Sequence, residues 1–191
     1  GGRLDGEALQ RLVVTHPSGV NVVPAPPRPE EHDQVTGSQV ERVLQSLART
    51  HDFVVVDVPR HFDERLGATL ELANRVLLVT STEMPSVKNA RLVLNLFRTL
   101  GLEEDQVKVV VNHVGPGGLN PREIQEVLDF PVFWKVPYDG AVQASVRHGK
   151  PVVIEKPRSA LGQNLIELSR TLAGAGPVRQ RNVFKRLFRR A

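Results

Sequence analysis

Residues 51–59 of this 191-residue chain read His51-Asp52-Phe53-Val54-Val55-Val56-Asp57-Val58-Pro59. Four consecutive apolar residues, three of them β-branched, are typical of a parallel strand that is covered on both faces. The run ends at Asp57, and the proline two residues later has no N–H to donate to a neighbouring strand. The stretch therefore predicts a buried strand over 53–56 with a carboxylate at its carboxyl end.

Helices and apolar strands alternate on both sides of this stretch. Further strands are expected at 20–23, 75–80, 107–111 and 132–136, with a last edge strand at 151–154. Helical spacing of apolar residues predicts helices over 4–16, 37–50, 63–73, 85–100, 121–128, 140–148 and 159–173. Such alternation implies right-handed βαβ crossovers and an α/β fold, in which a mostly parallel sheet carries helices on both faces.

Polar groups follow the predicted strands at the point where each strand ends. In order along the chain these are Asp57, then Thr80, Ser81 and Thr82, then Asn112, and finally Pro137, Tyr138 and Asp139. Ligands of parallel α/β sheets bind beyond the carboxyl ends of the strands. Because these ends share one edge of the sheet, we expect the polar groups to converge on a nucleotide.

Two of these side chains have both a functional and a structural interpretation, and a third has a structural one. The carboxylate of Asp57 suits a water bound to Mg²⁺ or an attacking water, but it also suits a cap on the following loop. The carboxamide of Asn112 matches the edge of adenine in a bidentate pair, although a turn-forming role is the simpler explanation when this residue is taken alone. Asp139 stands where it would cap the helix that begins near Gly140.

Composition excludes several classes of protein. Apolar residues make up 40% and charged residues 24% of the chain, which is ordinary for a globular domain. The formal net charge is +4, yet six basic and no acidic residues follow Val178, leaving 19 basic and 21 acidic residues before it. No specific binding of nucleic acid is therefore expected from the body of the chain. The chain has no cysteine, which excludes disulfides and thiolate metal sites.

The last residues of the chain alternate apolar and basic side chains. On a helical wheel they divide into an apolar arc of about 140° and an opposite cationic arc. The apolar arc holds Val183, Phe184, Leu187 and Phe188, and the cationic arc holds Lys185, Arg186, Arg189 and Arg190. Such a helix gains apolar burial and charge attraction on an anionic bilayer. We expect a domain over 1–173, a flexible hinge at 174–178 and a basic amphipathic membrane-targeting tail at 179–191, with a disordered solubilising tail as the alternative.

The sequence contains no phosphate loop of the form Gly-x-x-x-x-Gly-Lys-Ser/Thr. The tetrapeptide His148-Gly149-Lys150-Pro151 includes a Gly-Lys pair, but it lacks the preceding strand and the earlier glycine, and a proline replaces the hydroxyl residue. These 191 residues alone are therefore not expected to hydrolyse ATP.

Several segments together resemble the MinD/ParA family of deviant-Walker P-loop ATPases, and most closely its CpaE/TadZ branch of Flp (tight-adherence) pilus assembly. Residues 3–26 are similar to a CpaE segment, and in this chain they end in Ser18-Gly19-Val20-Asn21-Val22-Val23-Pro24-Ala25-Pro26. Residues 51–59 resemble the Walker B strand, and 110–113 resemble the adenine strand with His113 where arginine is usual. Residues 136–152 give the most specific match, and the tail is similar to the membrane-targeting helix of MinD.

The resemblance implies a cytoplasmic protein, peripheral at the inner face of the cell membrane, that forms an ATP- and Mg²⁺-dependent homodimer. It implies that Asp57 serves Mg²⁺ through a water, that Asn112 binds adenine, and that Pro137, Tyr138 and Asp139 form the base-side loop. The implied function is positioning of a pilus (Flp/Tad) secretion apparatus at the membrane, with pilus or division machinery as partners. A MinD-type septum-site ATPase and a nucleotide-independent dimerisation scaffold are the alternatives.

The chain departs from this family at its beginning. Family members begin with a strand, the phosphate loop, a helix and a second strand, and this sequence, which starts at Gly1-Gly2, contains none of them. The first strand would lie beside the strand that ends at Asp57, so its absence would expose two buried edges. We therefore expect the 191 residues to be the carboxyl portion of a longer protein or a sequence that is cut short.

Overall fold

A computed structural model describes residues 9, 11–32, 34–58, 62–115 and 117–174. The described residues fall into two units, one within residues 1–73 and one within residues 74–177. The predicted tail over 179–191 lies outside the described residues, and of the predicted hinge only Gly174 is described, as the cap that ends the last helix. No helix in the described part of the chain is long and apolar enough to cross a membrane.

The first unit contains a small hairpin and a pair of helices. The hairpin consists of β1 (Val14–Thr15) and β2 (Asn21–Val22), which pair antiparallel. Three helices follow: α2 (Pro29–His32), α3 (Gly37–Thr50) and α4 (Glu64–Leu72). A capping box between Thr36 and Gln39 begins α3. Gly37 packs so closely on α4 that an added Cβ would lie 2.8 Å from the carbonyl oxygen of Glu64.

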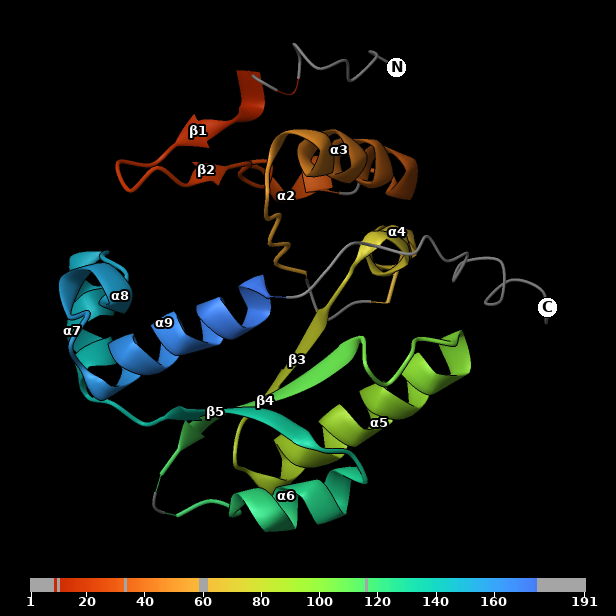
Figure 1. Cartoon of the computed structure of the whole chain (residues 1–191). Coiled ribbons are helices and arrows are strands. Elements are labelled where there is room, and N and C mark those ends of the chain that lie inside the picture. The colour runs from red at the N-terminus through yellow and green to blue at the C-terminus, as the bar shows by residue number, and fades with distance from the viewer. Residues whose placement is uncertain (1–8, 10, 33, 59–61, 116, 175–191) are drawn as a thin grey trace. The chain divides into compact units, whose positions relative to one another are not determined.

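The second unit is a three-layer α/β structure (Figure 1). Its parallel sheet has the strand order β3-β4-β5. The strands are β3 (Val76–Thr80), β4 (Val107–Val114) and β5 (Val132–Pro137). The helices are α5 (Met84–Leu100), α6 (Pro121–Leu128), α7 (Ala141–His148), α8 (Val152–Glu155) and α9 (Ala160–Ala173). Figure 1 shows α5 and α6 on one face of the sheet and α9 on the other, which confirms the predicted fold class.

The core of this unit lies on both faces of β4. Alternate residues of a strand point to opposite faces, and Val109 and Val111 are fully buried, as is Ile124 on α6. On the other face, Val110 packs with Val136 of β5 and Leu161 of α9. Val110 is therefore covered by α9, and Val109 and Val111 are buried on the opposite face. This is expected for a strand in the middle of a sheet that is covered on both faces.

The strand predicted over 53–56 is wrong. Residues 53–58 form no helix or strand, and the exposed fractions of Phe53 and Val55 are 64% and 94%. A strand is stabilised by hydrogen bonds to a neighbour, and no described strand pairs with this segment. The described parallel sheet consequently has three strands, and the predicted strand that ends at Asp57 is not one of them.

Three smaller predictions also need correction. Within the helix expected over 4–16, Val14 and Thr15 instead form β1, because they pair with β2. The edge strand expected at 151–154 is the short helix α8, because the carbonyl of Pro151 accepts hydrogen bonds from the N–H groups of Ile154 (2.9 Å) and Glu155 (3.0 Å). His148 Nδ1 lies 2.5 Å from Glu155 Oε1, which lowers the pKa of that carboxyl and ties α8 to α7. The strand expected at 20–23 is present as β2, but it belongs to the hairpin and not to a parallel sheet.

Candidate functional site

The carboxyl ends of β3, β4 and β5 meet at one edge of the sheet. Thr80 pairs with Val111, and Val114 pairs with Pro137. The register therefore brings together the residues that follow each strand. These are Thr80 at the end of β3 with Ser81 and Thr82 after it, Asn112 and His113 near the end of β4, and Pro137 at the end of β5 with Tyr138 after it.

Asn112 is half-buried near the end of β4, and its backbone neighbour is unusual. Its Oδ1 accepts a hydrogen bond from the N–H of His113 at 3.0 Å. His113 has a φ of 59°, a left-handed conformation that few non-glycine residues adopt. Among the hydrogen bonds of the described residues none involves the amide nitrogen of Asn112, and the side-chain oxygen retains a second lone pair. The carboxamide is therefore held in place and still able to bind a polar edge such as that of adenine.

Tyr138 follows β5 and lies beside the end of β4, the strand that carries Asn112. Its N–H donates to the carbonyl of Val114 (3.2 Å), which extends the pairing of β4 and β5 beyond Pro137. Its side chain is 59% exposed, and its ring meets the His113 ring edge-on, with the centroids 6.1 Å apart and the planes at 88°. Two aromatic rings at the end of the sheet offer apolar surface to a planar ligand. The described residues thus fit the base of a nucleotide.

The loop after β4 packs tightly on the end of β3, and sequence analysis missed this contact. The carbonyl of the buried Thr82 accepts a hydrogen bond from the N–H of Leu119 (2.9 Å). A Cβ added to Gly118 would lie 2.1 Å from Thr82 Oγ1, so only glycine fits here. The glycine-rich sequence of this loop was the available signal, but it did not reveal which threonine the loop covers.

Asp139 caps helix α7, as predicted from its position. Its Oδ1 accepts from the N–H of Ala141 (2.8 Å), and its Oδ2 accepts from the N–H of Leu161 (3.1 Å). The hydrogen bonds from Ala141 and Leu161 lower the pKa of this carboxyl. Asp139 therefore joins the starts of α7 and α9, and its role beside a bound base stays a prediction.

Asp57 lies in the other unit, where it is exposed. Its convergence with Asn112 and its service to Mg²⁺ stay predictions. Within the described ranges, no cluster of three or more His, Asp or Glu side chains could hold a metal ion. A magnesium ion held mainly by phosphate oxygens and water needs no such cluster.

Sequence comparison finds relatives among ATP-binding proteins, while no protein-family model matches the chain. An uncharacterized ATP-binding protein of Methanocaldococcus jannaschii is 27% identical over 175 residues, which cover 90% of this chain and 66% of that protein. A putative septum site-determining protein MinD of Guillardia theta is 26% identical over 83% of this chain and 61% of its own length. The MinD protein of Mesostigma viride is 29% identical over 73% of this chain and 51% of its own length.

Solved structures share the fold over most of the chain. A ParA family ATPase from Chlorobium tepidum superposes with a TM-score of 0.81 and 22% identity, over 88% of this chain and 71% of that one. MinD from Pyrococcus horikoshii, complexed with Mg-ADP, gives a TM-score of 0.74 and 23% identity, over 87% of this chain and 70% of that one.

The comparisons support homology to the MinD/ParA ATPases. The chain spans about half to two thirds of the length of these three relatives.

Proposed function

We propose that the chain is part of an ATP-dependent, dimerising protein that positions a larger assembly at the membrane. The observation that carries this proposal is the edge formed by Asn112, His113 and Tyr138, which fits an adenine base on a sheet of the MinD/ParA fold. The Mg-ADP in the MinD structure of Pyrococcus horikoshii supports a nucleotide as the ligand.

In this proposal each residue of the edge has a distinct task. Asn112 donates from its free amide to the base, while the N–H of His113 holds its oxygen in place. Pro137 and Tyr138 border the base, and Asp139 fixes the loop by capping α7. Asp57 would hold a water molecule bound to Mg²⁺. The positive charge of this ion would offset the negative charge of the phosphates.

The phosphates require residues that this sequence does not contain, because it has no phosphate loop. We propose that a strand carrying this loop pairs with the free edge of β3. Leu77 and Val79 on β3 are 40% and 58% exposed, and Phe53 and Val55 are more exposed still. Leu77 and Val79 lie on the same face of β3, so their exposure marks an uncovered face, and β3 is also an edge strand of the described sheet. Such edges normally pair with a neighbour, which supports the proposal.

The basic tail would supply the membrane contact in this proposal. We predict that the chain co-sediments with vesicles rich in anionic lipid. Phe184→Asp with Phe188→Asp should abolish this co-sedimentation because it removes the apolar arc. Neutral vesicles serve as the control. Two such tails on one dimer would strengthen binding by roughly 10²–10⁴-fold through effective concentration. Equal sedimentation of the double variant would contradict the role given to the tail.

Pilus positioning remains our first proposal for the biological role, and it rests on the resemblance of residues 3–26 and 136–152 to the CpaE/TadZ branch. Septum-site placement is the second candidate, favoured by the MinD names of several relatives. Deletion of the gene in its source organism distinguishes them, since loss of pili supports the first role and misplaced septa support the second. A phenotype rescued by a variant that cannot bind nucleotide would instead support a nucleotide-independent scaffold.

A further inference from the structure

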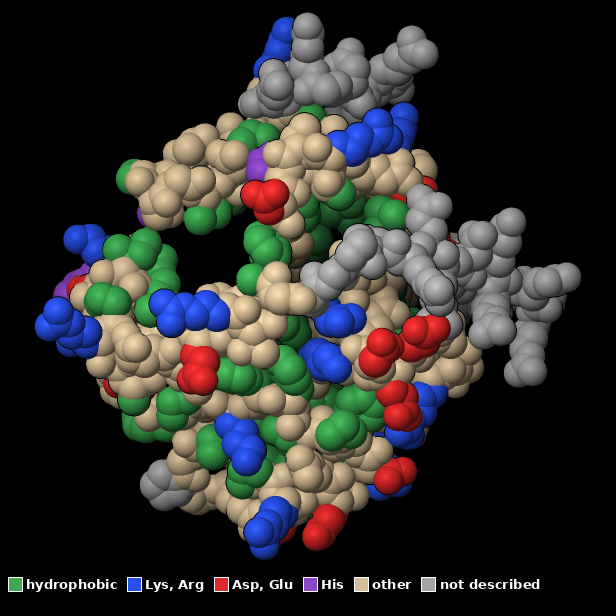
Figure 2. Space-filling view, in the orientation of Figure 1, with side chains coloured by type: hydrophobic (Ala, Val, Ile, Leu, Met, Phe, Trp, Pro, Cys, Tyr) green, Lys and Arg blue, Asp and Glu red, His purple; other side chains and the backbone are tan. Residues whose placement is uncertain are grey.

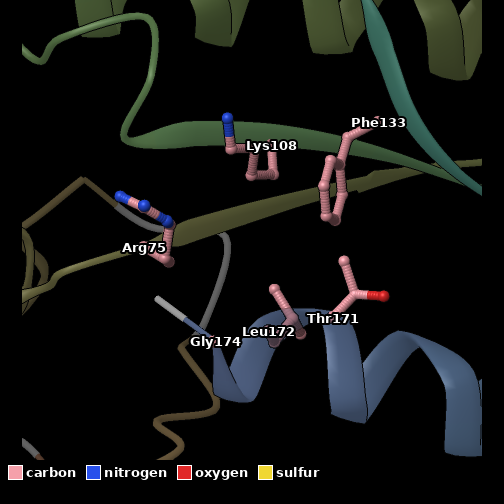
Figure 3. A pocket seen from close by; sticks show the side chains of 6 residues that line it. All are labelled: Arg75, Lys108, Phe133, Thr171, Leu172 and Gly174. Carbon is pink, nitrogen blue, oxygen red and sulfur yellow. The ribbon is translucent and has the colours of Figure 1, made fainter. Parts of the chain in front are cut away.

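A cavity lies at the opposite end of the sheet from Asn112. It has a volume of about 220 Å³, and Figure 3 shows its lining of strand and helix side chains. These residues are Arg75, Lys108, Phe133, Thr171, Leu172 and Gly174. Arg75 directly precedes β3, and Lys108 and Phe133 are the second residues of β4 and β5. The cavity therefore lies at the amino ends of the strands, apart from the proposed nucleotide edge.

An irregularity in the sheet directs Phe133 into this cavity. Val109 pairs with Val132, but Val110 pairs with Trp134, so Phe133 is an extra residue without a partner on β4. A bulge of this kind changes the direction of a side chain. The amino group of Lys108 lies 5.6 Å from the centroid of the Phe133 ring, a cation–π distance. The bulge thus places an aromatic face beside a cation.

The cavity carries an excess of positive charge. Among the described ion pairs none includes Arg75 or Lys108, and none of the lining residues is acidic. The described hydrogen bond of the Arg75 guanidinium is to the carbonyl of Asn74 (3.2 Å). The carboxyl end of α9 contributes only about half a negative charge. The lining therefore holds two cations and no carboxylate. The space-filling view shows Lys and Arg side chains at the surface beside α9, with Asp and Glu side chains on the same face (Figure 2).

Size and chain connectivity narrow the class of ligand. A volume of about 220 Å³ is smaller than the ~300–1,000 Å³ of most small-molecule sites, so the cavity suits a compact anionic group and not a nucleotide. Gly174 lines the cavity and precedes Arg179, the first basic residue of the tail, by five positions. The first basic residue of the tail therefore follows the cavity lining within five positions of the sequence.

We propose that Arg75, Lys108 and Phe133 bind the phosphate of an anionic phospholipid headgroup at the bilayer contacted by the tail. The two cations attract the phosphate diester, and the Phe133 ring contacts the glycerol portion. This inference rests on the proposed membrane role, to which it adds a headgroup site separate from the tail. Each basic side chain near an anionic surface strengthens binding by a factor of about five.

The single tryptophan of the chain provides a local reporter, because the Trp134 ring lies 6.0 Å from that of Phe133. We expect short-chain phosphatidylglycerol, kept below its micelle concentration, to change Trp134 emission with a saturable dependence. The variant Arg75→Gln with Lys108→Gln keeps the side-chain stems and should bind several-fold more weakly, because it removes both cations of the cavity lining. The matched control, Arg122→Gln with Arg147→Gln, removes two exposed cations outside the cavity and should bind as the unmodified chain does.

Two further titrations identify the ligand. Short-chain phosphatidylcholine has the same phosphate with a compensating positive charge and should bind several-fold more weakly. Inorganic phosphate should compete only at much higher concentration than phosphatidylglycerol. Equal affinity for inorganic phosphate would overturn the assignment to a lipid, and so would equal weakening by the two pairs of glutamine substitutions.

The tail variant separates this site from the proposed membrane role. Phe184→Asp with Phe188→Asp should abolish vesicle sedimentation but leave the Trp134 response to short-chain phosphatidylglycerol unchanged. If the cavity variant alters neither readout while the tail variant abolishes sedimentation, the headgroup site is overturned and the membrane role stands. If the tail variant sediments normally and the cavity variant loses the Trp134 response, the role of the tail fails and the headgroup site stands.

Discussion

Two valine-rich runs in this protein have similar composition and opposite environments. Val107–Val111 forms the middle strand of the sheet, where Val109 and Val111 are fully buried. Phe53–Val56 has no regular structure in the other unit, and Val55 is 94% exposed. The first run has a hydrogen-bonded neighbour on each side, whereas no described strand pairs with the second.

The difference shows that β-branched composition indicates a strand only where a partner is present. Strand preference reflects packing against neighbours more than an intrinsic preference of the backbone. The Phe53–Val56 run therefore has the composition of a central strand without its environment. In our account an additional strand beside it would restore that environment.

Charge substitution in the two runs tests this comparison with the largest expected effect. Val109→Asp buries an unpaired carboxylate and should lower the free energy of unfolding of the second unit by about 4 kcal/mol or more. Val55→Asp should change the free energy of unfolding of the first unit by less than about 0.5 kcal/mol, since that side chain is exposed. Urea unfolding followed by Trp134 fluorescence reports on the second unit, and far-UV circular dichroism, which includes α3 and α4, reports on the first. A large loss of stability from Val55→Asp would show that this run is covered in solution.

A second test asks whether close packing extends to the loops of the sheet edge. Gly118→Ala brings a methyl group against Thr82 and should destabilise the second unit by about 1–3 kcal/mol. Gly140→Ala is the matched control, because an added Cβ there meets no atom within 4 Å and the φ of −61° suits alanine. Equal unfolding midpoints for the two variants would contradict the packing of this loop on Thr82.

The smallest expected effect is on the pH dependence of folding stability, to which Asp139 contributes. Its pKa is lowered in the folded protein by hydrogen bonds from Ala141 and Leu161, so its stabilising contribution is present above the ordinary aspartate pKa of about 3.9. This contribution is lost as the pH falls through the lowered folded pKa. Asp139→Asn should therefore reduce the fall in urea midpoint between pH 7 and pH 2. Asp129→Asn, at a helix end with left-handed backbone that asparagine tolerates, should leave the fall unchanged.

Local signals explain which parts of the fold were predictable. The bounds of α3 and α6 agree with prediction, because apolar residues at helical spacing mark both helices in the sequence. The structure adds a capping box at the start of each, at Thr36 and Asn120. The strands of the second unit were predicted because their neighbours lie in the same unit. The cap on α7 by Asp139 was predicted for the same local reason.

Features that depend on distant contacts were not predictable. The prediction of a strand at 53–56 failed because strand formation there depends on a pairing partner and not on the residues of the run. The bulge at Phe133 arises from the register between β4 and β5, which composition does not encode. The close approach of Gly118 to Thr82 likewise joins residues that are 36 positions apart.

The most direct test of the central claim is a titration of the ¹⁵N-labelled chain with adenosine and with ATP, followed by NMR. We predict weak binding of both, of similar affinity, with shifts centred on the amides of Asn112, His113 and Tyr138 and lost in Asn112→Ala. Similar affinity follows because the sequence contains no phosphate loop. Shifts confined to other residues, or tight binding of ATP by these 191 residues alone, would contradict the claim.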